Sequence, residues 1–279
     1  MQPLVDAARV AAALRAEIPE RVRDDASLPR HAELVSASPD EVRPATECAP
    51  EWQVRAVAAT GSTNADLLAA ARDGAPAGTV LAADYQGAGR GRLGRAWVAP
   101  PGSMVAFSVL LRPRAPRERW TWLPLLAGLA VAGAIGPARL KWPNDVLLED
   151  KKVCGILAEA ADDAVVIGIG VNTAMTPGQL PVPTATSLAI AGLPHDPTAL
   201  VAGILRELDK WYRLWEAGQD ISAAYTRACA TISRDVNVIV SESEQVAGRA
   251  LRVDSQGCLV VATAEGERAF SAGDVVHVR

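Results

Sequence analysis

The sequence predicts an α+β protein, with a larger domain built on a mixed sheet and a small β domain after it. Strand patterns between residues 52 and 172 come mostly in neighbouring pairs, which favours hairpins over the alternating units of a doubly wound sheet. Beyond residue 232 the chain holds only short strand patterns, with turns expected at Gly248, Gly257 and Gly266. Short strands separated by glycine turns are typical of a small barrel.

Three segments are expected along the chain. Residues 1–51 should hold an N-terminal helix and a proline-rich linker or poorly ordered insert, residues 52–231 the catalytic domain, and residues 232–279 the small β domain. The helix covers Leu4 to Ile18 and ends at Pro19, after which prolines recur among charged residues. A DNA-reading helix-turn-helix needs two consecutive packed helices, so we expect none here.

Hydrophobic periodicity predicts the elements between these ends. A strand at 52–60 leads to a helix capped by Ser62 or Thr63, and a buried strand at 79–86 leads to a glycine-rich loop at 87–103. The remaining elements are a strand at 104–111, a buried helix at 120–135, short strands at 139–142 and 145–148, longer strands at 153–160 and 164–171, helices at about 197–218 and 220–230, and the short strands of the tail.

Composition narrows the possible classes of protein. The chain has 279 residues with a net charge of −4, which gives no general reason to bind nucleic acid. No apolar run is long enough for a membrane span, and the N-terminus lacks the layout of a signal peptide, so we expect a cytoplasmic protein. The four cysteines are scattered without histidine partners, and only three histidines exist, so no protein metal site is predicted.

The densest chemical signal is GAGRGRLGR, from Gly87 to Arg95. Glycines let backbone N–H groups approach an anion, and the arginines add fixed charge with forked donors, which suits a ligand that carries carboxylate and phosphate. The match to G-x-G-x-x-G is not a dinucleotide fingerprint, because Pro100 and Pro101 follow instead of a helix. A solvated surface loop and a short nucleic-acid tract are the alternative interpretations.

Two further motifs carry polar groups at the ends of predicted elements. KWPND places Lys141 at a strand end, where a fixed cation suits a reaction at an α-phosphate; an ordinary turn is the alternative. GSTN places Ser62, Thr63 and Asn64 at a helix start, where they either cap the helix or bind the polar end of a small ligand. With Gln86 they could satisfy a urea-type ring, which has two N–H donors and one carbonyl.

A fourth pattern lies on two adjacent strands, KKVCGIL and VIGIGVN. Glycine within a strand marks the close approach of a ligand or of another part of the chain, and tight packing is the simpler interpretation for any one glycine. The pattern's residues are Lys152, Gly155, Gly168, Gly170 and Asn172.

Taken in order, G-S-T-N, Q-x-x-G-R-G-R-x-G-R-x-W, K-W-P-N-D, K-x-x-G-I-L and G-x-G-x-N closely resemble the biotin protein ligase family from about Gly61 to Ser187. The resemblance implies a class II synthetase-like biotin–lipoyl ligase domain followed by an SH3-like barrel. It implies that biotin and ATP, with Mg²⁺ on the phosphates, give biotinyl-5′-AMP and pyrophosphate. A lysine of the biotin carboxyl carrier protein then receives the biotinyl group.

The resemblance also assigns residues. It implies that Lys141, Arg90 and Arg92 promote the reaction. The biotin-binding set is Ser62, Thr63, Asn64, Gln86, Arg90, Gly91, Arg92 and Lys141, and the ATP-binding set is Arg92, Arg95, Trp97, Asn144, Lys152 and Asn172. Many bacterial relatives add a DNA-binding domain, and residues 1–51 depart from that pattern. We therefore expect a monomer or weak homodimer that binds neither nucleic acid nor membrane and has no repressor role.

Three rival functions remain. A lipoate ligase would share the fold, but a dithiolane ring has no hydrogen-bonding groups to occupy Ser62, Thr63 and Gln86, and GRGRLGR would be missing. A repressor that only binds the adenylate would need a DNA-binding domain. An inactive binding module would not need every motif position expected to do chemistry to be filled.

Overall fold

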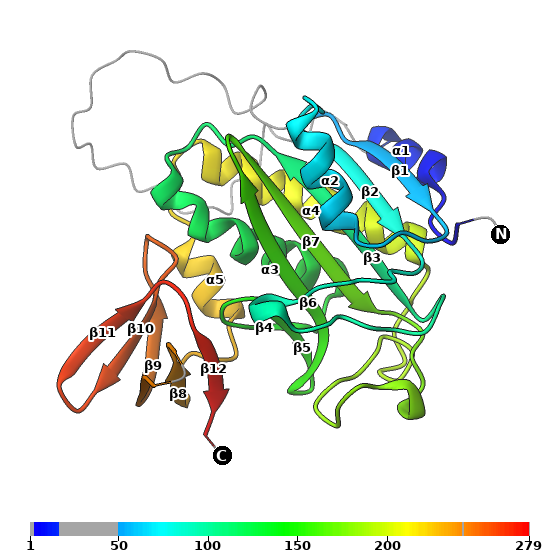
Figure 1. Ribbon diagram of the computed structural model, residues 1–279. Helices are drawn as coiled ribbons and strands as arrows, with labels where there is room; N and C mark the ends of the chain where they lie inside the picture. The colour runs from blue at the N-terminus through cyan, green and yellow to red at the C-terminus, as the bar shows by residue number, and fades with distance from the viewer. Residues whose placement is uncertain (1–2, 17–49, 242, 279) are drawn as a thin grey trace, which may run out of the picture.

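The computed structural model describes residues 3–16, 50–241 and 243–278. A seven-stranded sheet forms its centre, with strand order β1-β2-β3-β7-β6-β5-β4 (Figure 1). Its strands are β1 (Gln53–Val57), β2 (Thr79–Ala83), β3 (Met104–Leu111), β4 (Arg139–Lys141), β5 (Asp145–Leu148), β6 (Lys151–Ala161) and β7 (Ala164–Asn172). The α+β prediction and the two-sheet organisation are confirmed.

One pairing in this sheet differs from the expected hairpins. β1 and β2 run parallel, with Gln53 opposite Thr79, because helix α2 (Thr63–Arg72) crosses between them. The other described strands pair antiparallel, and β6 and β7 form the expected long hairpin. Alternation of glycine turns and apolar runs could predict strands here, but not the direction in which β1 pairs.

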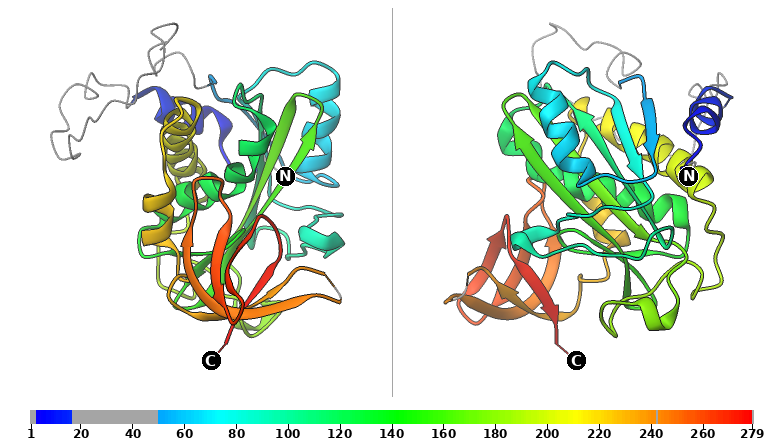
Figure 2. Two further views of the ribbon diagram at one scale, coloured as in Figure 1. Left: turned by 90° about the vertical axis from the view of Figure 1, so that its left-hand side faces the viewer. Right: turned by 45° about the vertical axis from the view of Figure 1, so that its right-hand side comes forward.

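Helices cover both faces of the sheet (Figure 2). Helix α2 packs on one face, against Leu81, Leu110 and Val166. Helix α3 (Leu123–Ile135) lies on the other face and contacts α4 (Pro197–Glu216), which forms the outer layer. Because α3 is apolar around its whole circumference, burial between the sheet and α4 accounts for its sequence.

A five-stranded antiparallel sheet forms the C-terminal part, with strand order β11-β10-β9-β8-β12. Helix α5 (Ser222–Ala228) leads into it, and its strands are β8 (Asp235–Ile239), β9 (Gln245–Val253), β10 (Leu259–Thr263), β11 (Gly266–Phe270) and β12 (Asp274–His277). The turn expected at Gly248 is wrong, because this residue lies inside β9. A Cβ there would lie 2.3 Å from the carbonyl oxygen of Ala262, so close strand contact explains the glycine.

Buried tryptophans join the small sheet to the main body. The Trp122 indole donates to the carbonyl of Ser255 at 2.8 Å, and its ring meets that of Tyr225 edge to face. The Trp142 indole donates to the carbonyl of Gly257 at 3.2 Å. The indole rings bury large apolar area while their N–H groups find partners, so the two parts share one core.

The N-terminal helix α1 (Ala7–Ala16) belongs to the same core. Val5 and Val10 are buried, and the Leu4 amide donates to the Asp84 carboxylate at 2.8 Å. Desolvation raises the pKa of Asp84, and the bonds from Leu4 and Val5 oppose that shift. The expected end of this helix at Pro19 and the proline-rich stretch 19–51 fall almost entirely outside the described residues. Among the described helices, none combines the length and apolarity that crossing a membrane requires.

We expect Val10→Ala to lower the free energy of unfolding by about 2 kcal/mol, because it leaves a cavity at a fully buried site. Urea denaturation measures the effect. Arg9→Ala, on the exposed face of the same helix, should change it by less than about 0.5 kcal/mol. A Val10→Ala protein as stable as the parent would show that α1 adds nothing to the core.

Candidate active site

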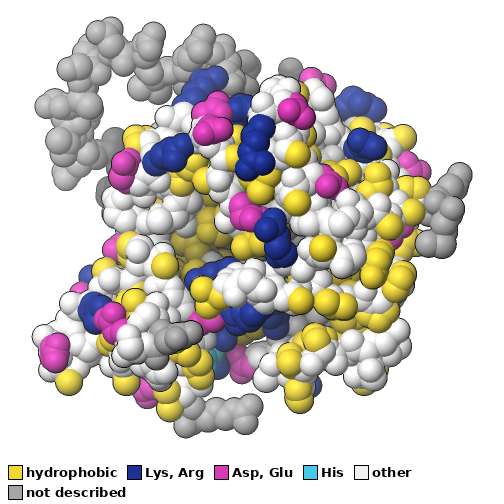
Figure 3. Space-filling view, viewed as in Figure 1, with side chains coloured by type: hydrophobic (Ala, Val, Ile, Leu, Met, Phe, Trp, Pro, Cys, Tyr) yellow, Lys and Arg dark blue, Asp and Glu magenta, His cyan; other side chains and the backbone are white. Residues whose placement is uncertain are grey.

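A cleft of about 720 Å³ lies between the main sheet, the glycine-rich loop and β12. Lys and Arg side chains gather in the recess between the larger and smaller parts of the molecule (Figure 3). All residues assigned from the sequence line this one cleft: Ser62, Thr63, Asn64, Gln86, Arg90, Gly91, Arg92, Arg95, Trp97, Lys141, Asn144, Lys152 and Asn172. Motifs spread over about a hundred residues therefore meet in one place.

The arginine loop (Gly87–Arg95) folds back on itself through backbone hydrogen bonds. The Gly91 amide donates to the Arg95 carbonyl at 2.7 Å, and the Trp97 amide donates to the Gly89 carbonyl at 2.9 Å. A Cβ at Gly89 would lie 2.5 Å from the Trp97 carbonyl oxygen, so this position requires glycine. The turn presents the side chains of Arg90, Arg92 and Arg95 at the cleft.

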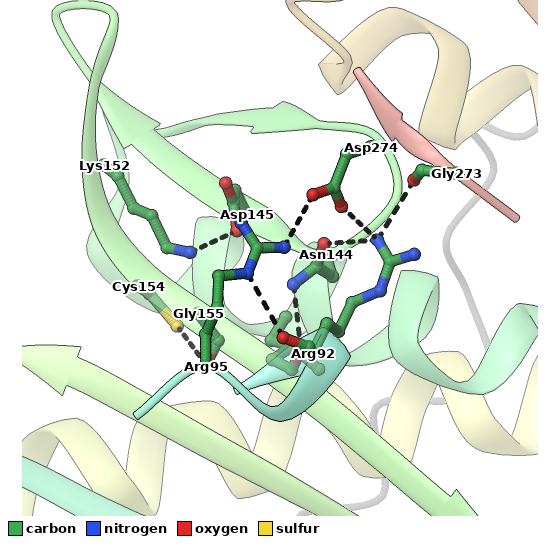
Figure 4. Close-up of polar contacts among 10 residues, drawn as sticks. Arg92, Arg95, Asn144, Asp145, Lys152, Cys154, Gly155, Gly273 and Asp274 are labelled. Carbon is green, nitrogen blue, oxygen red and sulfur yellow. Dashed lines mark hydrogen bonds and ion pairs between the residues drawn. The ribbon is translucent and has the colours of Figure 1, made fainter. Parts of the chain in front are cut away.

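Arg92 and Arg95 reach across the cleft to the C-terminal sheet (Figure 4). Arg92 Nη1 donates to Asn144 Oδ1 at 3.0 Å and to the Gly273 carbonyl at 3.2 Å, and it lies 3.5 Å from Asp274 Oδ1. Arg95 Nη2 lies 2.7 Å from Asp274 Oδ2. Burial lowers the pKa of Arg92, while the Asp274 charge opposes that shift. Asp274 therefore holds the arginine loop and the small sheet together.

KWPND forms the tight turn between β4 and β5, with Lys141 paired opposite Asp145. Trp142 is buried beneath it, and Asn144 joins two neighbours: its Nδ2 donates to the Ile156 carbonyl at 3.1 Å, and its Oδ1 accepts from Arg92. Asn144 thereby links the turn that follows Lys141 to β6 and to the arginine loop.

Carboxylates neutralise most cations of the cleft. Arg90 pairs with Glu159 at 3.3 Å, and Lys152 Nζ lies 2.6 Å from Asp145 Oδ1. Arg92 and Arg95 share Asp274. Within the described part of the chain, Lys141 is the lining cation without a carboxylate at ion-pair distance. Its charge is therefore the one most available to an anionic ligand.

A second, polar part of the cleft lining is a hydrogen-bonded network around Thr63, Asn64 and Gln86, to which the Glu159 carboxylate is bonded. The Thr63 amide and hydroxyl donate to Gln86 Oε1 at 2.8 and 3.1 Å, and the Asn64 amide donates to Glu159 Oε2 at 2.8 Å. Ser108 Oγ lies 2.7 Å from Thr63 Oγ1. Ser62 caps α2, with its Oγ 3.4 Å from the Ala65 amide. Helix capping and cleft lining, posed as alternatives from the sequence, therefore occur together.

Strand glycines make room for two of these cleft residues. A Cβ at Gly168 would lie 2.2 Å from Asn64 Oδ1, and a Cβ at Gly170 would lie 2.6 Å from Trp97 Nε1. Trp97 consequently lies flat on the sheet, with Lys152 Nζ 5.3 Å from its ring centroid. Tight packing, the simpler interpretation of these glycines, is what the structure shows, and the packed side chains themselves line the cleft.

The sequence motifs do not indicate Asp145 as a charge partner, and they give no sign of Ser108, Glu159 or Asp274. The Arg95–Asp274 contact spans 179 positions in the chain, so no local pattern could have revealed it. The available signal was a run of arginines expected at a binding site with no acidic residues close to them in the sequence, since partly buried charges require counter-charges. Among the residues described, no group of three His, Cys, Asp or Glu side chains could hold a metal ion.

The model described as the Biotin/lipoate A/B protein ligase family matches residues 59–172, and the Biotin protein ligase C terminal domain model matches residues 231–278. The Biotin--[acetyl-CoA-carboxylase] ligase of Mycobacterium tuberculosis is 41% identical, covering 81% of this chain and 90% of that relative. The chain therefore belongs to the biotin protein ligase family and is an enzyme.

A second relative and a solved structure are also similar to this chain. The Bifunctional ligase/repressor BirA of Bacillus subtilis is 35% identical, covering 74% of this chain and 68% of that protein. Among solved structures, the biotin protein ligase from Aquifex aeolicus in complex with biotin and ATP has a TM-score of 0.71 and 26% identity. It covers 81% of this chain and 98% of its own. The similarity extends through the catalytic sheet and the small C-terminal sheet.

We expect Asn64→Asp to destabilise the protein at pH 7 by about 3 kcal/mol, because the oxygen that replaces the amide nitrogen would face the Glu159 carboxylate and the Leu157 carbonyl, two acceptors. These acceptors should raise the folded-state pKa of the new acid. Its protonated form is then favoured on folding, so stability should recover as pH falls toward the unfolded value of about 3.9. Thermal unfolding between pH 7 and pH 4 measures both effects.

The control for this substitution is Gln219→Glu, which adds the same charge at an exposed position between α4 and α5. It should leave stability within about 0.5 kcal/mol of the parent. Equal stability of the Asn64→Asp protein and the parent at pH 7 would mean that the Asn64 amide does not serve as a buried donor.

Proposed function

We propose that this enzyme joins biotin to ATP and then transfers the biotinyl group to a lysine of the biotin carboxyl carrier protein of acetyl-CoA carboxylase or a related carboxylase. A biotin carboxylate oxygen attacks the α-phosphorus, and pyrophosphate leaves. The lysine amine then attacks the acyl carbon, and AMP leaves. The observation that carries the proposal is Lys141, a cation without a carboxylate partner among the described residues, in a cleft that is also lined by the neutral polar side chains of Ser62, Thr63 and Gln86.

The polar end suits the ureido ring of biotin. Ser62, Thr63 and Gln86 offer hydroxyl and amide groups that could pair with its two N–H donors and its carbonyl. Asn64, whose amide already serves Glu159 and Leu157, would hold this set in place. Arg90, Gly91, Arg92 and Lys141 would then meet the carboxylate. The presence of both groups in one cleft supports one ligand with a polar ring and an acidic tail.

ATP would occupy the region between the arginine loop and the KWPND turn. Its binding residues are Arg92, Arg95, Trp97, Asn144, Lys152 and Asn172, of which Asn172 is fixed by its bond to the Thr186 carbonyl at 2.9 Å. Mg²⁺ would bind to the phosphates of ATP, since the described residues offer no preformed site for it. Lys141 and the arginines would stabilise the charge that develops at the α-phosphate, and bound reactants gain on the order of 7–11 kcal/mol from positioning.

The choice of acid can be tested directly. With ATP and Mg²⁺, biotin should drive pyrophosphate release, whereas lipoate and octanoate should not. The ends of these two acids that lie away from the carboxylate have no groups that can pair with the polar part of the cleft. Release driven by lipoate alone would overturn the proposal in favour of a lipoate ligase.

We further propose the protein's setting. Residues 1–51 would form an N-terminal segment, 52–231 the catalytic domain and 232–279 the small β domain. The enzyme would act in the cytoplasm as a monomer or weak homodimer and would neither bind nucleic acid nor repress transcription. The burial of Val5 and Val10 in the core of the main body supports the absence of DNA binding, because α1 is then unavailable as part of a free DNA-reading unit.

We expect Lys141→Ala to reduce adenylate formation by on the order of 100-fold or more while the biotin affinity stays close to the parent value. A fixed cation contributes most where charge develops in the transition state. Biotin-dependent pyrophosphate release and calorimetric biotin binding measure the two quantities. Lys210→Ala, at an exposed lysine of α4, is the control and should match the parent. Near-normal pyrophosphate release by Lys141→Ala would remove the assigned role.

We expect Arg92→Gly to make biotinyl-5′-AMP but to release it. Removing Arg92 deletes the loop's hydrogen bonds to Asn144 and Gly273 and leaves Arg95 as its contact with Asp274, so the cover over a reactive adenylate should loosen. With ATP, biotin and serum albumin, the variant should biotinylate albumin, while the parent and Arg55→Gly should not. Unlabelled albumin at a parental rate of adenylate formation would contradict the retention role.

A further inference from the structure

A hydrogen-bonded relay connects the last strand of the protein with the residue that follows Lys141. The Trp142 amide, next to Lys141, donates to Thr231 Oγ1 at 3.2 Å, and Thr231 Oγ1 lies 3.0 Å from His277 Nε2. Thr231 is fully buried. The relay therefore joins the KWPND turn to β12 through a single hydroxyl group.

The donors and acceptors of this relay fix the state of the imidazole. Arg234 Nη1 lies 3.4 Å from His277 Nδ1, and a guanidinium can only donate, so Nδ1 must accept. The ring proton of a neutral imidazole then sits on Nε2 and points at Thr231 Oγ1. That oxygen accepts from both the Trp142 amide and His277, while its own proton faces the buried Cys229 thiol. Every polar group of the relay is thereby satisfied with His277 neutral.

The surrounding charges favour the same state. Lys141 from β4 and Arg234 from the segment before β8 face the ring, and Asp150 from the β5–β6 turn partly offsets them while pairing with Arg234 at 2.7 Å. Burial and then the two cations lower the pKa of His277 to about 4. A second cation against Lys141 would push its ammonium group away from its present place.

We propose that His277 is a positioning residue for adenylate formation, which acts through Thr231 to hold the Lys141 turn against the cleft. His277 does not line the cleft, so it does not touch a ligand there. The role rests on the proposed reaction, but the relay itself is a property of the protein alone. A merely structural histidine would affect stability without affecting the Trp142 amide or the rate at saturating substrate.

The first measurement is hydrogen exchange of the segment 139–146 in the ligand-free protein, which follows the Trp142 amide. His277→Ala and Thr231→Val should expose this amide and accelerate its exchange about tenfold or more. His277→Gln keeps a donor for Thr231 and an acceptor for Arg234, and Thr231→Ser keeps the hydroxyl, so both should match the parent. Val278→Ala, at the exposed residue that follows His277, is the control.

The second measurement is biotin-dependent pyrophosphate exchange. His277→Ala and Thr231→Val should lower kcat by on the order of tenfold with the KM for biotin unchanged, since a small displacement of a catalytic group costs rate more than binding. His277→Gln and Thr231→Ser should restore kcat. Parental kcat and exchange protection in His277→Ala and Thr231→Val would overturn the proposal, as would failure of His277→Gln to rescue.

Lowering the pH provides a third test, which does not depend on the folding of His277→Ala or Thr231→Val. A histidine with a lowered folded-state pKa binds a proton more readily in the unfolded chain, so its contribution to stability is present above 6.5 and is lost as pH falls toward about 4. The parent should lose Trp142 protection over this range, and His277→Gln should keep it. Equal loss in both would overturn the proposal. Absence of any biotin-dependent exchange in the parent would defeat the proposed reaction instead, while the hydrogen-exchange result still decides the relay.

Discussion

The convergence of positive charge on one cleft is the constraint on which the rest of this structure depends. Five cationic side chains line it, namely Arg90, Arg92, Arg95, Lys141 and Lys152. Without an anion between them they would repel one another in a partly desolvated site. Glu159, Asp145 and Asp274 offset this repulsion, and each comes from a different strand of the two sheets. The fold must therefore place carboxylates as well as cationic side chains at the cleft.

The way these charges are paired separates two kinds of cation. Arg92 and Arg95 share one carboxylate, which phosphate oxygens can replace without any change in what the arginines need. Lys141 has no such partner among the described residues and is followed by Trp142, whose backbone amide and indole are bonded to Thr231 and Gly257. Under the proposed mechanism, the arginine loop can change position when phosphate oxygens replace Asp274, whereas Lys141 has to keep one position relative to the α-phosphorus. The difference in support matches the two roles proposed for them.

Much of this could be predicted from the sequence, and the failures share one physical cause. The strand and helix patterns from Gln53 to Asn172 follow hydrophobic periodicity, and every assigned site residue lies at the cleft because each motif sits at an element's end or on a strand facing it. The parallel pairing of β1, the place of Gly248 inside β9 and the acids that pair with the arginines depend on contacts between distant segments. Local patterns carry no information on such partners.

The C-terminal sheet shows why motif matching underestimates what holds a site. No motif of the catalytic part includes β12, yet its first residue holds the arginine loop and its last residue reaches the lysine turn through Thr231. The two ends of one short strand thereby contact the arginine loop directly and, through Thr231, the residue after Lys141. A strand keeps its residues at regular spacing of about 3.3 Å, so it transmits position better than a loop of the same length. The small sheet is therefore part of the active site's geometry, although it contributes few of the groups that would touch the reactants.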